Sequence, residues 1–163
     1  MLTKGKGLKK IGLRGHKMPH IKRKPSKGIK RRVRSKRRKK GELTKLKEKL
    51  WMLCRQLTKK KYGNSCYTCG RLVPNGKGIH TAHYITSSLC STALRFDLRN
   101  LRPGCYHCNI NLSGNWPAYQ KAIEKEIPGI TGILLAENEA TKGITYPLSW
   151  FQAKILEYEA KLI

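Results

Sequence analysis

The chain has 163 residues and a formal net charge of +27, with 36 lysines and arginines against nine acidic residues. This length suits one domain with an appendage, since domains commonly span about 100–150 residues. No apolar run approaches the roughly 20 residues of a membrane span and no signal-peptide core opens the chain, so we expect a soluble protein of the cytoplasm rather than a membrane protein.

The first 40 residues carry 19 lysines or arginines and no acidic residue. Such a segment cannot bury enough apolar surface to offset the entropy of ordering it. We therefore expect residues 1–41 to be a disordered basic arm that binds nucleic acid, and residues 42–163 to form the folded domain. The predicted phosphate contacts of the arm are Arg31, Arg32, Arg34, Arg37, Arg38, Lys39 and Lys40. A localisation signal and a solvated tail are the alternatives.

Apolar residues recur at three- and four-residue steps from Glu42 to Lys61. This period predicts a basic amphipathic helix that ends at Gly63. Residues 66–104 are rich in Gly, Pro, Asn and Ser, so we expect loops and a small hairpin there. Short β-favouring pieces lie near 71–73, 79–85 and 94–96.

Two cysteine pairs share the spacing CxxC and are separated by 35 residues. Thiols stay reduced inside cells, so two such pairs predict a tetrahedral structural zinc site rather than disulfides. The predicted ligands are Cys66, Cys69, Cys105 and Cys108. We expect Cys54 and Cys90 to be free thiols, with Cys54 in the core.

Helices should follow the second cysteine pair. A short helix should come first. The second should cover 116–127, with Pro117 in its first turn and Pro128 after its end. A weaker helix should cover 131–140. In the last helix, Ser149 and Gln152 form a capping-box pattern. Its apolar stripe should pack against the zinc module, with a dimer interface as the alternative; the stripe comprises Phe151, Ile155, Tyr158 and Leu162.

The 35 residues between the pairs exceed what a zinc ribbon needs. The polar residues that stand out are His80, His83, Asp97 and Asn100, with Asn109 directly after the last cysteine. The zinc would hold a strand with His83 beside a helix with Asn109. A histidine that faces a hard oxygen ligand is an arrangement that can cut phosphodiesters.

These motifs resemble a known family. The stretches "CYTCG", "TAHYITSS" and "LRFDLRNLRPGCYHCNINLSGN", followed by Tyr119, are similar to the NinG/Rap family of phage recombination endonucleases. The layout is also similar to HNH, or ββα-metal, nucleases such as phage endonuclease VII, a Holliday-junction resolvase. The resemblance covers roughly residues 64–127. It implies an α+β fold with a zinc-stabilised, treble-clef-like ββα-metal core and flanking helices.

The resemblance also implies roles for single residues. It puts His83 in the place of the general base, and Asn109 where these nucleases bind a catalytic Mg²⁺ or Mn²⁺. Asn100 falls at the middle asparagine of the HNH pattern, where its amide would tie the loop that orients the imidazole. The arginines close enough in sequence to hold phosphates are Arg95, Arg99 and Arg102.

The chain departs from the HNH pattern at Ala82, where many of these nucleases have Asp or His as a second metal ligand. His80 or Asp97 could supply this contact, or His83 could itself be a ligand. A histidine packed in the hairpin and a helix-capping Asn109 are the plainer interpretations.

The family likeness implies a metal-dependent endonuclease that cuts branched DNA, such as Holliday junctions and displacement loops, in phage recombination. Its products would carry 5′-phosphate and 3′-hydroxyl ends. The enzyme would act in the host cytoplasm. Symmetric cuts suggest a homodimer, formed through residues 43–57 or 151–162. Two alternatives stay open: a non-catalytic zinc-stabilised nucleic-acid-binding protein, and an HNH enzyme that nicks linear duplex.

Overall fold

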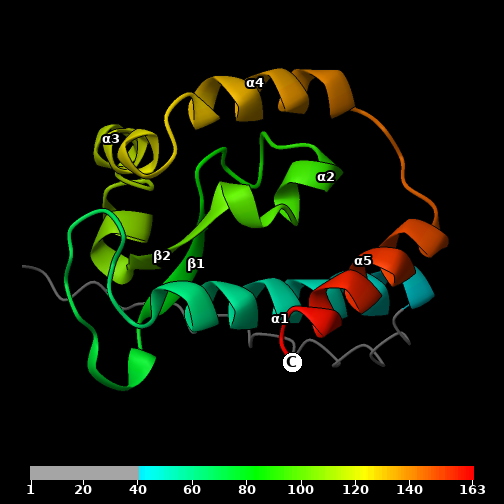
Figure 1. Ribbon diagram of the computed structural model, residues 1–163, viewed down its shortest axis with the longest axis horizontal. Coiled ribbons are helices and arrows are strands. Elements are labelled where there is room, and N and C mark those ends of the chain that lie inside the picture. The colour runs from blue at the N-terminus through cyan, green and yellow to red at the C-terminus, as the bar shows by residue number, and fades with distance from the viewer. Residues whose placement is uncertain (1–40) are drawn as a thin grey trace, which may run out of the picture. The chain divides into compact units, whose positions relative to one another are not determined.

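The computed structural model describes residues 41–163, so the predicted phosphate contacts from Arg31 to Lys40 lie outside the described residues. The described part is a mixed α+β structure in which a two-stranded hairpin lies between two groups of helices (Figure 1). Its elements are α1 (Glu42–Tyr62), η1 (Pro74–Gly76), β1 (Ile79–His83), α2 (Thr92–Arg95), η2 (Leu98–Asn100), β2 (Leu101–Cys105), η3 (His107–Asn111), α3 (Trp116–Glu126), α4 (Ile130–Thr141) and α5 (Leu148–Ala160). No helix within residues 41–163 is both long and apolar enough to span a membrane.

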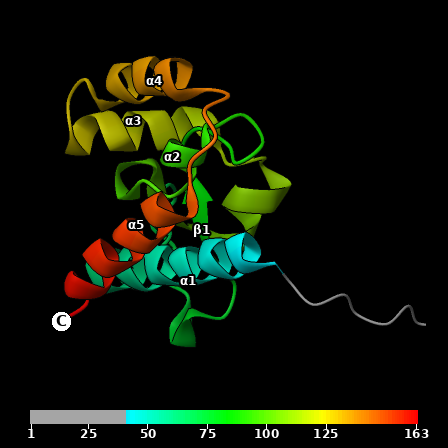
Figure 2. The ribbon, with the colours of Figure 1, turned by 90° about the vertical axis from the view of Figure 1, so that its right-hand side faces the viewer.

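Helices α1 and α5 pack side by side on one side of the hairpin (Figures 1 and 2). Their apolar stripes, with Phe96 and Leu101, form one core cluster that includes Leu50, Leu53, Cys54, Leu57, Phe151, Ile155 and Tyr158. The predicted α1 helix and the buried position of Cys54 are thus confirmed. The expectation that the last stripe packs in the core is confirmed: it contacts Phe96 and Leu101 between the cysteine pairs, and α1 is its larger partner.

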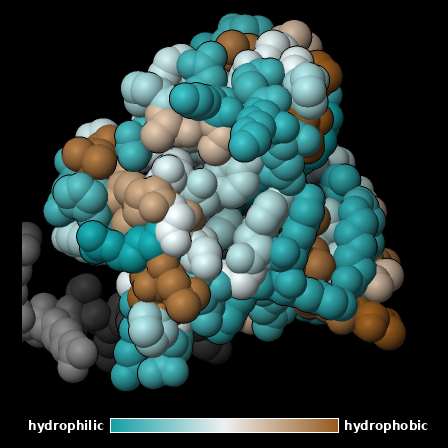
Figure 3. Space-filling view, turned by 60° about the vertical axis from the view of Figure 1, so that its left-hand side comes forward, coloured by the Kyte–Doolittle hydropathy of each residue, from teal (hydrophilic) through white to brown (hydrophobic). Residues whose placement is uncertain are grey.

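The capping box predicted at Ser149 is absent, because α5 begins one residue earlier, after Pro147, without a side-chain cap. Helices α3 and α4 confirm the predicted segments 116–127 and 131–140 to within a residue or so. They pack on the other side of the hairpin against Tyr84 and Leu94. On the face shown in Figure 3, hydrophilic residues predominate and hydrophobic ones form small separate groups, as is usual for surface in contact with water.

Strand β1 pairs with β2 in an antiparallel register that sets Ile79 opposite Cys105 and His83 opposite Leu101. No strand was predicted at β2, because its residues LRPGC include proline and glycine, which usually interrupt strands. The strand expected near 94–96 is wrong. Its first residues belong to α2, where the Ser91 hydroxyl accepts a hydrogen bond from the Leu94 amide.

The prediction that Arg102 holds phosphates is contradicted, because its side chain is only 1% exposed. Its Nε donates to Glu126 Oε2 at 2.9 Å, and its Nη1 donates to backbone carbonyls that include that of Leu101, at 2.8 Å. The guanidinium also lies against the rings of Tyr62 and Tyr67. Arg102 therefore ties β2 to helices α1 and α3.

This ion pair predicts an acid-sensitive contribution to stability. Burial raises the pKa of Glu126, but hydrogen bonds from Tyr67 and Tyr62 and the charge of Arg102 outweigh it and lower the pKa from 4.5 to about 2. Since the folded-state pKa is depressed, the carboxylate stabilises the fold above pH 4.5 and loses this effect as the pH falls towards 2. Glu126→Gln should cost about 1.5–3 kcal/mol at neutral pH, the value of a hydrogen bond to a charged group.

Urea denaturation of Glu126→Gln at a series of pH values measures this contribution. The matched control is Glu139→Gln, since Glu139 is 70% exposed and, among residues 41–163, pairs only with the surface Lys142. The control should change the free energy of unfolding by less than about 0.5 kcal/mol. Equal effects of the two substitutions at neutral pH would contradict the structural role of the Arg102–Glu126 pair.

Candidate metal centre and active-site groove

The four predicted zinc ligands cluster at one end of the hairpin. The sulfur atoms of Cys66, Cys69, Cys105 and Cys108 all lie within 4.8 Å of one another. Four thiolates about 2.3 Å from a zinc ion would lie about 3.8 Å apart, and the Cys69 and Cys105 sulfurs are 3.8 Å apart. Three of the four cysteines are buried, so the donor set and its spacing fit a structural zinc ion.

Hydrogen bonds to these sulfurs suit thiolate ligands. The Cys108 amide lies 3.5 Å from Cys105 Sγ, and Thr68 Oγ1 lies 3.2 Å from Cys66 Sγ. Burial raises the pKa of the Cys66 thiol, but hydrogen bonds from the Cys105 backbone and from Thr68 outweigh it and lower that pKa to about 6. Outside the cluster, burial raises the pKa of Cys54 to about 12, which keeps that core residue a thiol.

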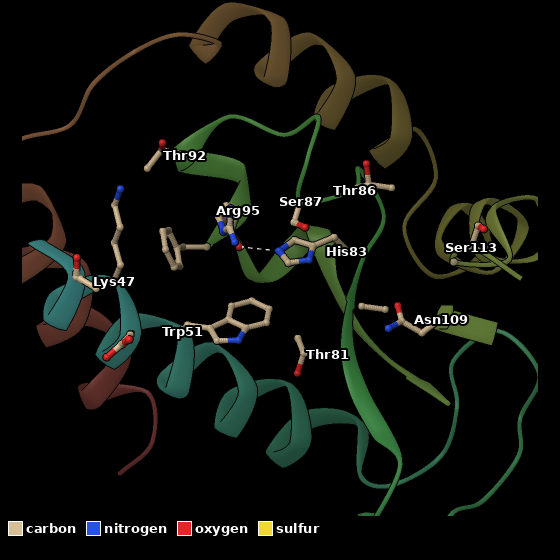
Figure 4. Close-up of a pocket in the computed structure, with 15 residues that line it drawn as sticks. Lys47, Trp51, Thr81, His83, Thr86, Ser87, Thr92, Arg95, Asn109 and Ser113 are labelled. Atoms are coloured by element: carbon tan, nitrogen blue, oxygen red, sulfur yellow. Dashed lines mark hydrogen bonds between the residues drawn. The ribbon is translucent and has the colours of Figure 1, made fainter. Parts of the chain in front are cut away.

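A groove of about 810 Å³ opens between α1, strand β1, helix α2 and the turn after η3 (Figure 4). His83 and Asn109 both line it, together with the hydroxyl residues Thr81, Thr86, Ser87, Thr92 and Ser113. Lys47 and Arg95 line it as well and add positive charge, and Glu48 adds a carboxylate. The structure thus brings the predicted base and the predicted metal ligand to one cavity.

His83 ends strand β1, and its imidazole is held from two sides. Nε2 lies 3.0 Å from the backbone carbonyl of Arg95, which can only accept a hydrogen bond (Figure 4). In the neutral ring Nε2 therefore carries the proton, and Nδ1 remains as a proton acceptor. Burial, together with the nearby positive charge of Arg95, lowers the pKa of His83 below 6.5 although the hydrogen bond to the Arg95 carbonyl raises it. The imidazole is consequently neutral at pH 7.

Trp51 supplies the second contact, which sequence reasoning missed. Its indole stacks on the His83 ring with 5.1 Å between centroids and 5° between planes. Trp51 lies 32 positions before His83, on a different element, so no local spacing connects the two. Its place on α1, off the apolar stripe that forms the core, was the available signal.

Asn109 points from η3 towards strand β1 (Figure 4). A Cβ placed on Gly104 would lie 3.1 Å from the Ala82 Cβ and 3.5 Å from the Asn109 Cβ, so position 82 adjoins Asn109. A carboxylate at position 82 would therefore stand beside Asn109, whereas the alanine offers no ligand atom.

The two residues predicted to replace this ligand lie outside the groove lining. His80 stands three residues before His83, about 10 Å earlier along the strand, and packs near Tyr106. Asp97 caps η2 by accepting from the Arg99 amide, and its carboxylate pairs with the Arg99 guanidinium at 2.7 Å. Arg99 pairs with Glu137 as well, so its charge is already engaged by two carboxylates.

Asn100 is fully buried and connects the segments that hold His83. Its Nδ2 donates to the carbonyls of Ile85 and Leu94, and its Oδ1 accepts from the Ile85 amide at 2.8 Å. Ile85 lies two residues after His83, and Leu94 precedes the Arg95 carbonyl that orients it. Asn100 makes no contact with the groove and is a positioning residue.

The comparisons with known proteins give one match. A family model described as Bacteriophage Lambda NinG protein matches residues 2–162. No curated protein and no solved structure matches the chain.

Proposed function

The chain belongs to the family of the bacteriophage lambda NinG protein, and on this premise we propose that it is a metal-dependent endonuclease that cuts branched DNA. Membership suggests a role in phage recombination. One observation supports the nuclease chemistry most: His83, oriented by a backbone carbonyl and kept neutral by burial, shares a groove with Asn109. Two strands followed by a short helix, closed by four cysteines, support the assignment to the ββα-metal nucleases.

His83 would act as the general base. Its Nδ1 takes a proton from a water molecule, and the oxygen of that water forms a bond to phosphorus. The bond from phosphorus to the 3′ oxygen breaks, and this oxygen takes a proton from solvent, which leaves a 5′-phosphate and a 3′-hydroxyl. Trp51 and the Arg95 carbonyl hold the ring so that Nδ1 needs no reorientation.

Asn109 would hold the divalent ion through its side-chain oxygen. The groove fits such an ion only in part, since alanine at 82 leaves Asn109 as the predicted oxygen ligand that lines it. Mg²⁺ commonly binds through one or two protein ligands, with waters and phosphate oxygens in its other positions. When bound, the ion stabilises negative charge on the leaving 3′ oxygen.

The His83 environment predicts the pH dependence of cleavage. Because the base must be neutral and its pKa lies below 6.5, the single-turnover rate should rise with pH and reach half its maximum below pH 6.5. Trp51→Ala should lower the rate and move this midpoint up towards 6.5, since it exposes the ring to water. Trp51→Phe keeps a stacked ring and should therefore keep the cleavage rate and the pH midpoint close to those of the wild type. A midpoint above pH 7 in the wild type would contradict the proposed base.

Selectivity for branched DNA is tested with a labelled four-way junction, a displacement loop and a linear duplex of the same sequence. The proposal expects paired nicks near the branch, at rates at least about tenfold above the duplex, a difference of about 1.4 kcal/mol in transition-state stabilisation. Equal rates would favour the enzyme that nicks linear duplex. Paired cuts also suggest a homodimer, which sedimentation in the presence of junction DNA would detect.

A further inference from the structure

One ridge of helix α1 borders two hollows of the surface. Residues at four-residue steps share a row on a helix, and this row comprises Lys47, Trp51, Arg55 and Lys59. Lys47 and Trp51 line the active-site groove, whereas Arg55 and Lys59 line a second hollow of about 300 Å³. The ridge therefore runs from the groove into the second hollow.

Strand β1 joins the two hollows from the opposite side. Thr81 lines both of them, Ile79 lines only the second, and His83 lines only the groove. Alternate residues of a strand share a face, so these three side chains follow one line along β1. The space between α1 and β1 is thus one seam, with the catalytic groove at one end.

The chemistry of the second hollow suits a polyanion. Arg55 and Lys59 are exposed cations, and none of the residues that line this hollow is acidic. Hydrogen-bonding side chains accompany the cations, among them Gln56 and Asn64. Such groups usually hold the phosphates and sugars of a nucleic acid and fix its register without reading bases.

We propose that this seam binds the DNA strand that flanks the scissile phosphate, with Arg55 and Lys59 on phosphates away from the cut. This inference rests on the proposed function only in that DNA occupies the groove. Arg55 and Lys59 lie four and eight residues from Trp51, the groove residue that stacks on His83, or about 6 and 12 Å along the helix. One strand of a duplex has a phosphate about every 3.4 Å of its axis, so these cations reach phosphates about two to four positions from the groove.

The test measures the salt dependence of DNA binding by the full chain without added divalent metal, with a short fluorescent duplex. Two lost phosphate contacts should reduce the slope of log K against log salt by about 1.8, at 0.9 for each contact. We expect this reduction for Arg55→Gln with Lys59→Gln. The matched control is Lys121→Gln with Lys125→Gln, which removes the same charge at the same spacing from α3, outside both hollows.

The exchange Arg55→Lys with Lys59→Arg keeps both charges and should keep the wild-type slope. Equal reductions in the two glutamine variants, or no reduction in the α1 variant, would overturn the proposed seam. Because binding without added divalent metal needs no cleavage, the two proposals fail separately. A chain that shows the predicted slopes but never cuts DNA would refute the nuclease and leave the seam.

Discussion

Replacing His83 with alanine should slow single-turnover cleavage by about 10²–10⁴-fold, the range that a positioned general base contributes. Nδ1 is the proton acceptor that the geometry leaves free in the groove, and alanine removes it without removing a cation that holds phosphate. Affinity for the junction should therefore stay within about twofold, which is less than 0.5 kcal/mol. Both quantities are measured on one labelled junction, by quenched-flow cleavage with Mg²⁺ and by anisotropy without added divalent metal.

His107→Ala is the matched control, since His107 is an exposed histidine of η3 that does not line the groove. It should cleave at the wild-type rate. A similar loss in both variants, or a loss of binding in His83→Ala, would assign His83 a structural role. Cleavage that survives His83→Ala would exclude it as the base.

Loss of the metal centre should unfold the domain. Two of the cysteines are borne by β2 and η3, and the other two by the loop before β1, so one zinc ion would join this loop to the end of the hairpin. Structural zinc sites bind with about 10–16 kcal/mol of apparent free energy, against a total stability of about 5–15 kcal/mol for a typical domain. Cys105→Ser should therefore abolish the cooperative thermal transition, and a strong chelator should do the same to the wild type.

Cys90→Ser controls for the change of a thiol to a hydroxyl, since Cys90 is partly buried but lies outside the four-sulfur cluster. It should keep about one zinc ion per chain and lower the stability by about 1 kcal/mol or less. Elemental analysis and circular dichroism measure the two effects. A wild-type chain without zinc, or a Cys105→Ser chain that melts as the wild type does, would contradict the structural zinc site.

The sequence indicated those features that rest on local patterns. Helices α1 and α3 were predicted from the spacing of apolar residues and from flanking Gly or Pro, because both act within a few residues. The cysteine spacing located the four-sulfur cluster for the same reason. Strand β2 carries no such pattern, because its place comes from pairing with β1 and not from the preferences of Pro103 and Gly104.

The candidate site divides in the same way. Asn109 stood out because it directly follows the last cysteine, and the family resemblance assigned a role to His83, but the Trp51 stack joins elements that are distant along the chain. Arg102 was misassigned because a positive charge in a basic sequence does not show whether the side chain is buried. Only the folded chain shows its pairing with Glu126.

The most direct test of the hydrolytic groove is single-turnover incubation of the wild-type full chain with a 5′-labelled four-way junction, with and without added Mg²⁺, followed by ligation of the products. The account predicts nicks with Mg²⁺, none without a divalent metal, and resealing by ligase, since hydrolysis at the 3′ oxygen leaves a 5′-phosphate and a 3′-hydroxyl. Junction DNA that is fully bound yet intact in both Mg²⁺ and Mn²⁺ would contradict it, and would identify the chain as a zinc-stabilised DNA-binding protein.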